Sequence, residues 1–147
     1  MSERTFTLEE AQALLPVLGA LLERAMEGKK KKDEIEAEMQ RVAARVFAMG
    51  GMRLDVVALV RRKSEGQRAA QQVRDALAEI TAAGVQVKDL GLGLLDFPCR
   101  VGDRVILLCW KAGEKRIAHW HTTDEGFAGR KPIQDGVINP EEDQKPN

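Results

Sequence analysis

The sequence predicts an α+β fold in which a long helical region precedes an antiparallel sheet. Apolar residues recur at helical spacing through residues 7–83, and the period changes to strand-like alternation after Gly84. The chain has 147 residues, of which 44% are hydrophobic, so it is the size of one domain and can form one core. We therefore expect a single domain over residues 1–138, divided into a helical part (7–83), a sheet (85–121) and an ordered loop (122–138), with a flexible polar tail over 139–147.

The first helix is expected to start at Thr7, because Thr7 and Glu10 have the spacing of a capping box. Apolar residues then continue in phase to Met49 in alternating steps of three and four. This pattern predicts one long amphipathic helix, from about Leu8 to Met49. Such a helix would be roughly 60 Å long at 1.5 Å per residue.

Three features leave an alternative open for this region. Pro16 lacks a backbone donor and should kink the first turns. Gly28 and Lys32 interrupt the apolar stripe, so a helical hairpin that turns near residues 28–32 is also compatible with the sequence. Gly50 and Gly51 end the helix in both cases, because glycine adopts the left-handed cap conformation without strain.

A second helix is expected to pack antiparallel on the first. Ser64 and Gln67 form a possible capping box at its start, and Gly84 is a suitable stop. The segment Leu54–Val60 fits either a short strand or the first turns of this helix. Antiparallel packing would bury the apolar stripes of both helices.

A four-stranded antiparallel meander is expected between Val85 and His121. Glycine comes first in the two-residue loops Gly102-Asp103 and Gly113-Glu114, which favours type II′ hairpin turns. The four expected strands are Val85–Val87, Leu94–Val101, Arg104–Trp110 and Arg116–His121.

The two assumed turns fix a register and place candidate metal ligands together. Cys99 pairs with Ile106, His121 also pairs with Ile106 from the other side, and His119 pairs with Leu108. Cys99, His119 and His121 then share one face and could bind zinc, with Asp124 or water as the fourth ligand. A one-residue slip would send a strand's side chains to the opposite face. The alternative is a half-buried pair of histidines whose rings bond to backbone or carboxylate groups.

Asp96 and Arg130 are two further candidates for a site. Asp96 lies inside a strand and needs a partner if it is buried, for which Arg116, Arg130 and Lys88 are candidates. Arg130 belongs to a glycine-rich loop, residues 126–132, that could bind a carboxylate or phosphate. Alternatively, this loop folds back on the sheet and Arg130 pairs with Asp96, Asp124 or Glu125.

Composition excludes several classes of protein. Lys and Arg total 23, as do Asp and Glu, so the net charge is zero and a nucleic-acid partner is not expected. No apolar run approaches the ~20 residues that span a membrane. The start of the chain lacks the pattern of a signal peptide, so we expect a cytoplasmic protein with reduced cysteines.

The sequence contains a set of short motifs, namely Phe6–Ala11, Gly84-Val85, Lys88–Leu90, Gly93–Pro98, Leu108–Trp110, Gly113-Glu114, Trp120-His121 and Gly126–Arg130. These motifs make the chain similar to a bacterial family of uncharacterised proteins, known only as a domain of unknown function. The similarity covers roughly residues 5–133. It implies a small cytoplasmic protein with long helices and a C-terminal sheet, and it implies no activity. Asp96, Trp120, His121, Gly129 and Arg130 match the family pattern, whereas Cys99 and His119 do not, which weakens the zinc hypothesis.

Two hypotheses of function follow. The first, which we favour, is a non-enzymatic module that forms homo-oligomers or binds a protein partner through its long amphipathic helix. The second is a protein that binds a small ligand or a metal such as zinc, or a hydrolase-like enzyme. Its site would be built around Asp96, His121 and Arg130, and Asp89 or Asp124 could join them. Trp120 and Gly129 are further candidates for binding the ligand.

Overall fold

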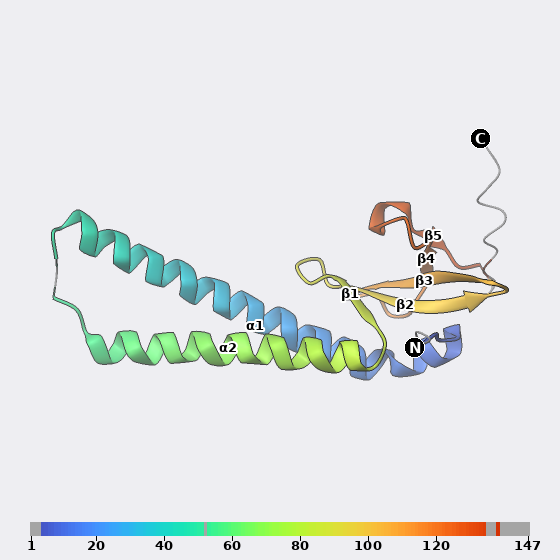
Figure 1. The fold of residues 1–147 in the computed structure, drawn as a ribbon, viewed down its shortest axis with the longest axis horizontal. Helices are drawn as coiled ribbons and strands as arrows, with labels where there is room; N and C mark the ends of the chain where they lie inside the picture. The colour runs from blue at the N-terminus through green and yellow to red at the C-terminus, as the bar shows by residue number, and fades with distance from the viewer. Residues whose placement is uncertain (1–3, 52, 135–137, 139–147) are drawn as a thin grey trace.

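The fold consists of a helical arm and a small head, seen in a computed structural model that describes residues 4–51, 53–134 and 138 (Figure 1). Two long helices run antiparallel to form the arm, and a five-stranded sheet packs on the first turns of α1 to form the head. The α+β class and the antiparallel helix pair are confirmed. The predicted tail over residues 139–147 lies outside the described residues. The elements are α1 (Leu8–Ala48), α2 (Val56–Ala82), β1 (Gln86–Asp89), β2 (Leu94–Val101), β3 (Arg104–Lys111), β4 (His119–His121), a 3₁₀ turn (Phe127–Gly129) and β5 (Lys131–Pro132).

Helix α1 is continuous, which confirms the long helix and rules out the hairpin near residues 28–32. Thr7 and Glu10 form both hydrogen bonds of the capping box, at 3.1 and 3.2 Å. The helix continues through Pro16. Gly28 interrupts the apolar stripe because α2 passes very close to it. A Cβ atom at Gly28 would lie 3.0 Å from the Ala69 carbonyl oxygen, so this glycine marks a helix contact and not a turn.

The N-cap of helix α2 lies nine residues before the predicted cap, Ser64. This N-cap is Asp55, whose carboxylate accepts the Ala58 amide at 3.0 Å. The predicted cap at Ser64 is therefore wrong, and Ser64 lies inside the helix. The first turns of α2 include most of the ambiguous segment Leu54–Val60. Gly84, with φ of 92°, follows the end of the helix as predicted.

The sheet is antiparallel throughout, in the order β1-β2-β3-β4-β5. The β2–β3 hairpin has the predicted register, with Cys99 opposite Ile106. The prediction of four strands missed β5, which pairs with β4. This strand has only two residues, one of them Pro132, and it forms because the chain folds back onto the edge of the sheet. Local sequence therefore gave no signal for it.

The predicted register of β4 is wrong by one residue. His119 lies opposite Cys109 and His121 opposite Leu107, so both imidazoles project to the other face of the sheet. The cause is Glu114, which does not sit in a two-residue turn. Its carboxylate accepts the Lys111 amide at 2.7 Å, and its carbonyl accepts the Trp110 indole N–H at 2.9 Å. These bonds hold a wider loop, and strand pairing resumes only at His119.

The hydrophobic core lies between α1 and one face of the sheet, called here the inner face. Phe6 packs edge-on against Phe97, with ring centroids 5.7 Å apart. Trp110 lies against Gly19 of α1, where a Cβ would be 3.3 Å from the indole ring. The register shift turns Trp120 to this face, where it is 4% exposed and part of the core. The opposite, outer face of the sheet carries Asp96, Cys109, His119 and His121.

Candidate functional site

A buried cluster of three chemically capable side chains lies on the outer face of the sheet. Asp96 on β2 pairs directly with Cys109 on β3, and the register of β4 brings His121 beside them. One ligand atom from each residue lies within 4.8 Å of the other two. Asp96 and His121 are fully buried, and Cys109 is 1% exposed. We call these three residues the outer-face cluster.

The two ring nitrogens of His121 have different partners. Nδ1 lies 2.8 Å from the Thr122 carbonyl oxygen, which can only accept, so Nδ1 carries a hydrogen and donates it. Nε2 lies 3.0 Å from Oδ1 of Asp96. A hydrogen bond in that contact needs one proton, held either by the imidazole or by the carboxyl group. Asp96 and His121 therefore act as one buried proton-sharing pair.

The other carboxylate oxygen of Asp96, Oδ2, is buried and has no hydrogen-bond partner among the described residues. A buried polar atom in this state is uncommon in folded proteins. It marks the outer-face cluster as a place where the described residues do not satisfy every polar group that is buried there.

Cys109 has the environment of an unreactive thiol. Burial, followed by the charge of Asp96, raises the pKa of Cys109 to about 11, although the neighbouring Arg130 acts in the opposite direction. Both nitrogens of His121 are engaged with other groups, so neither is placed to deprotonate the thiol. The geometry therefore gives no support to a cysteine nucleophile here.

The trio predicted to bind zinc does not come together. Cys99 is 5% exposed and belongs to the inner-face core, whereas His119 and His121 lie on the outer face. His119 instead approaches Glu114, with Nδ1 3.8 Å from Oε2. Cys109 takes the place expected for Cys99, because the register of β4 moves the histidines to the side of the sheet where Cys109 lies.

Arg130 connects the segment after β4 to the loop between β3 and β4. Its guanidinium donates to both carboxylate oxygens of Glu114, at 3.1 and 3.0 Å, and lies 4.4 Å from the centre of the Phe127 ring. Burial alone would raise the pKa of Glu114, but the bonds from Arg130 and from the Lys111 amide lower it below its usual value. The prediction that this loop folds back on the sheet agrees with this geometry. The predicted partners of Arg130, namely Asp96, Asp124 and Glu125, were wrong.

Glu125 closes the loop that follows β4. It accepts hydrogen bonds from the Thr122 hydroxyl at 2.8 Å and from Lys131 Nζ at 2.6 Å. These bonds lower the pKa of Glu125 to about 2, and the bond from Lys131 has the largest effect. Gly129 packs against the same side chain, and a Cβ there would lie only 2.7 Å from a carboxylate oxygen. Gly129 thus has a packing role in this loop.

Comparison with protein families identifies the group to which this chain is related. The model of a family described as "Uncharacterized conserved protein (DUF2203)" matches residues 4–133. The chain belongs to the DUF2203 family. The family resemblance stated above is confirmed, while the bacterial origin and the residues assigned to the family pattern stay predictions. Comparisons with curated proteins and with solved structures found no significant match.

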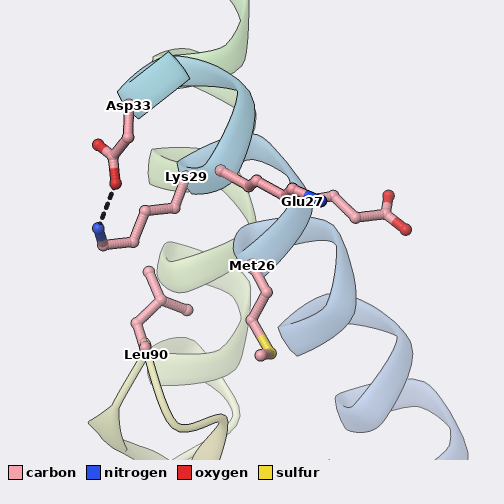
Figure 2. Close-up of a pocket in the computed structure, with 7 residues that line it drawn as sticks. Met26, Glu27, Lys29, Asp33 and Leu90 are labelled. Carbon is pink, nitrogen blue, oxygen red and sulfur yellow. Dashed lines mark hydrogen bonds and ion pairs between the residues drawn. The ribbon is translucent and has the colours of Figure 1, made fainter. Parts of the chain in front are cut away.

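The junction between arm and head has a surface pocket in this DUF2203 chain, and two of the charged residues that line it, Lys29 and Asp33, pair with each other. Figure 2 shows Leu90 to one side of Met26, with Lys29 bonded to Asp33 and Glu27 pointing away. The Lys29–Asp33 pair measures 2.6 Å, and both side chains are nearly half exposed. The pocket therefore has the character of a solvated surface next to a hydrophobic arm–head contact.

Most of the large exposed apolar side chains among the described residues lie at the end of the arm. Phe47 is 90% exposed, and Val56 and Val60 are 65% and 58% exposed. A groove between α1 and α2 opens beside them, and Figure 1 shows the two helices separating toward this end. No helix of the described residues is long and apolar enough to span a membrane. The groove is lined by Met39, Val42, Ala43, Val46, Phe47, Leu54, Val56, Leu59, Val60 and Lys63.

The same end of the arm is strongly basic, although the chain as a whole is neutral. Residues 39–63 contain six cationic side chains and one anionic side chain, Asp55, which gives a net charge of +5. Arg62 is paired with Glu38 and Glu65. The other five cations form no ion pair with any described residue. They are Arg41, Arg45, Arg53, Arg61 and Lys63.

Proposed function

We propose that this protein is a partner-binding module whose arm binds an acidic amphipathic helix of another protein. The observation that carries the proposal is the apolar groove at the end of the arm, where large side chains such as Phe47 stay exposed. Contiguous exposed apolar surface on a folded protein marks an interaction site. It contributes little to folding, because folding does not remove it from water.

The shape of the groove favours a helix as the occupant. It lies between two helices that diverge toward the end of the arm (Figure 1), and a third helix would complete a small bundle. An amphipathic helix placed in such a groove would bury its apolar face against residues of both α1 and α2. The head, packed on the other end of α1, would remain outside this contact.

The charge of the groove's surroundings favours an acidic partner over a second copy of the chain. Two arms joined end to end would bring together two regions that each carry a net charge of +5. An acidic helix would instead meet complementary charge, which speeds association and selects against basic partners. Homo-oligomerisation through the arm, also predicted above, is the main competing outcome.

Fluorescence anisotropy with a designed helical peptide tests the proposal. The probe has leucines along one face and glutamates beside them, and a second peptide replaces every glutamate with lysine. We expect the acidic peptide to bind more weakly as salt increases, and we expect the basic peptide not to bind. Failure of the acidic peptide to bind, or equal binding of both peptides, contradicts the proposal.

A matched pair of valine variants locates the binding surface. Val60 lines the groove and Val57 does not, yet both lie on α2 and are similarly exposed, at 58% and 63%. We expect Val60→Glu to weaken binding of the acidic peptide at least ~10-fold, since burying a valine contributes roughly 1.5–3 kcal/mol. Val57→Glu, which changes the charge equally, should have a much smaller effect. Light scattering after size exclusion should show a monomer, and a dimer broken by Val60→Glu would favour self-association.

A further inference from the structure

The outer-face cluster combines a carboxylate, a thiol and an imidazole, which is a donor set suited to a transition metal. The three residues come from three neighbouring strands, so the sheet itself fixes their relative positions. Their ligand atoms lie within 4.8 Å of one another, and all three side chains are buried. Ligands about 2.0–2.3 Å from a zinc ion lie within about 4 Å of each other, so small side-chain adjustments bring all three to one ion.

His121 already has the orientation of a metal-binding histidine. Its Nδ1 donates to the Thr122 carbonyl at 2.8 Å, which leaves Nε2, 3.0 Å from Asp96 Oδ1, as the nitrogen available to a metal. Metal-bound histidines commonly donate their second ring N–H to a backbone carbonyl in this way, because the bond fixes the tautomer and the ring orientation. The arrangement needs no rotation of the ring to present a lone pair to the cluster.

Asp96 provides a second, independent reason to expect a cation. Its Oδ2 atom is fully buried without a hydrogen-bond partner among the described residues, while Oδ1 meets the lone-pair side of the imidazole. A buried carboxylate in such a position is stabilised by a proton or by a metal ion. A divalent ion with one carboxylate, one thiolate and one neutral imidazole would give a site of zero net charge.

We propose that Asp96, Cys109 and His121 bind one Zn²⁺ ion. A thiolate with an imidazole and a carboxylate favours zinc over the hard cations Mg²⁺ and Ca²⁺, which prefer oxygen ligands. Arg130 is a neighbour of Cys109 and would donate to the zinc-bound thiolate, as outer groups around metal sites do. This site differs from the predicted trio in its cysteine, its face of the sheet and its use of Asp96.

The chain contains a matched control for the zinc site in its second cysteine. Cys99 and Cys109 are both buried, but Cys99 lies in the inner-face core, away from the cluster. The wild-type chain, Cys109→Ala and Cys99→Ala are produced without a histidine tag in medium containing zinc. Bound zinc is measured by mass spectrometry, and a cobalt-loaded sample of each protein is examined for a thiolate-to-metal charge-transfer band.

We expect one zinc ion per chain and the charge-transfer band in wild type and Cys99→Ala, and loss of both in Cys109→Ala. A chelator should lower the melting temperature of the first two proteins and leave that of Cys109→Ala unchanged. Zinc bound equally by the two variants, or by neither, overturns the proposal. If Cys109→Ala does not fold, the wild-type cobalt spectrum decides, because absence of a thiolate band there is incompatible with Cys109 as a ligand.

Discussion

The outer face of the head and the end of the arm both depart from the usual distribution of side chains. The head buries polar residues, and the arm exposes a large apolar one. The head buries Asp96 and His121 completely, whereas the arm leaves Phe47 90% exposed. Carboxylates are seldom fully buried without a partner, and large apolar groups usually gather inside. In the head the unusual residues are held by neighbouring strands, so changing them should affect folding. At the end of the arm they contact little of the chain, so changing them should affect binding.

The largest effect is expected in the head, from breaking the Asp96–His121 pair. Asp96→Ala leaves the imidazole buried without its partner, which should lower the free energy of unfolding by about 3–5 kcal/mol. Asp96→Asn retains an N–H that can donate to Nε2 and should lose only about 1 kcal/mol. Urea unfolding in the presence of a chelator measures both values without a contribution from metal. Similar losses in the two variants would show that the shared proton does not stabilise the pair.

The register of β4 shows where sequence reasoning reached its limit in the head. The β2–β3 hairpin was predicted correctly, because Gly102 and Asp103 form a two-residue turn whose backbone sets the register. The next connection also contains a glycine, Gly113, but side-chain and backbone bonds of Glu114 widen it. Because of this one-residue difference in register, Cys109 lies on the same face as the histidines, where Cys99 was predicted. Asp96 and His121 were identified from sequence, but the bond between them depends on tertiary structure.

The arm was easier to predict because its pattern is local and repeated. The phase of the apolar residues gave the length of α1, and the capping box gave its start. The start of α2 was misplaced although Asp55, directly before Val56 and Val57, was an equally good cap signal. The role of Gly28 could not be predicted, since it depends on how closely the two helices approach.

An intermediate effect is expected where the two helices of the arm pack closely. Gly28→Leu should lower the free energy of unfolding by about 1–3 kcal/mol, because a side chain there meets Ala69 and Val73 at 3.0 Å. Ala44→Leu, on an exposed position of the same helix, should change it by less than about 0.5 kcal/mol. Thermal unfolding followed by circular dichroism compares them. Equal stability of the two variants would mean that the arm is packed less closely than described.

A smaller effect is expected in the loop that Glu125 closes on the head. The pKa of Glu125 is lowered to about 2 from 4.5, so the stabilisation is present above pH 4.5 and is lost as the pH falls toward 2. Because the side chain is 34% exposed, we expect at most about 1 kcal/mol from it. Hydrogen exchange of residues 122–131 should be slower in wild type than in Glu125→Gln near neutral pH. The two proteins should converge as the pH falls, and a difference that persists at the lowest pH would assign the protection to other contacts.

The smallest effect on stability is expected at the end of the arm. Phe47→Glu should change the free energy of unfolding by less than about 0.5 kcal/mol, because folding buries little of this ring. The same variant should lose binding of the acidic helical peptide, since Phe47 lines the groove. Val17→Glu is the control, an exposed apolar position at the head end of α1 that should affect neither quantity. A marked loss of stability in Phe47→Glu would mean that the ring is already covered within the free protein. Preserved stability with lost binding would mean that this phenylalanine acts only when a partner covers it.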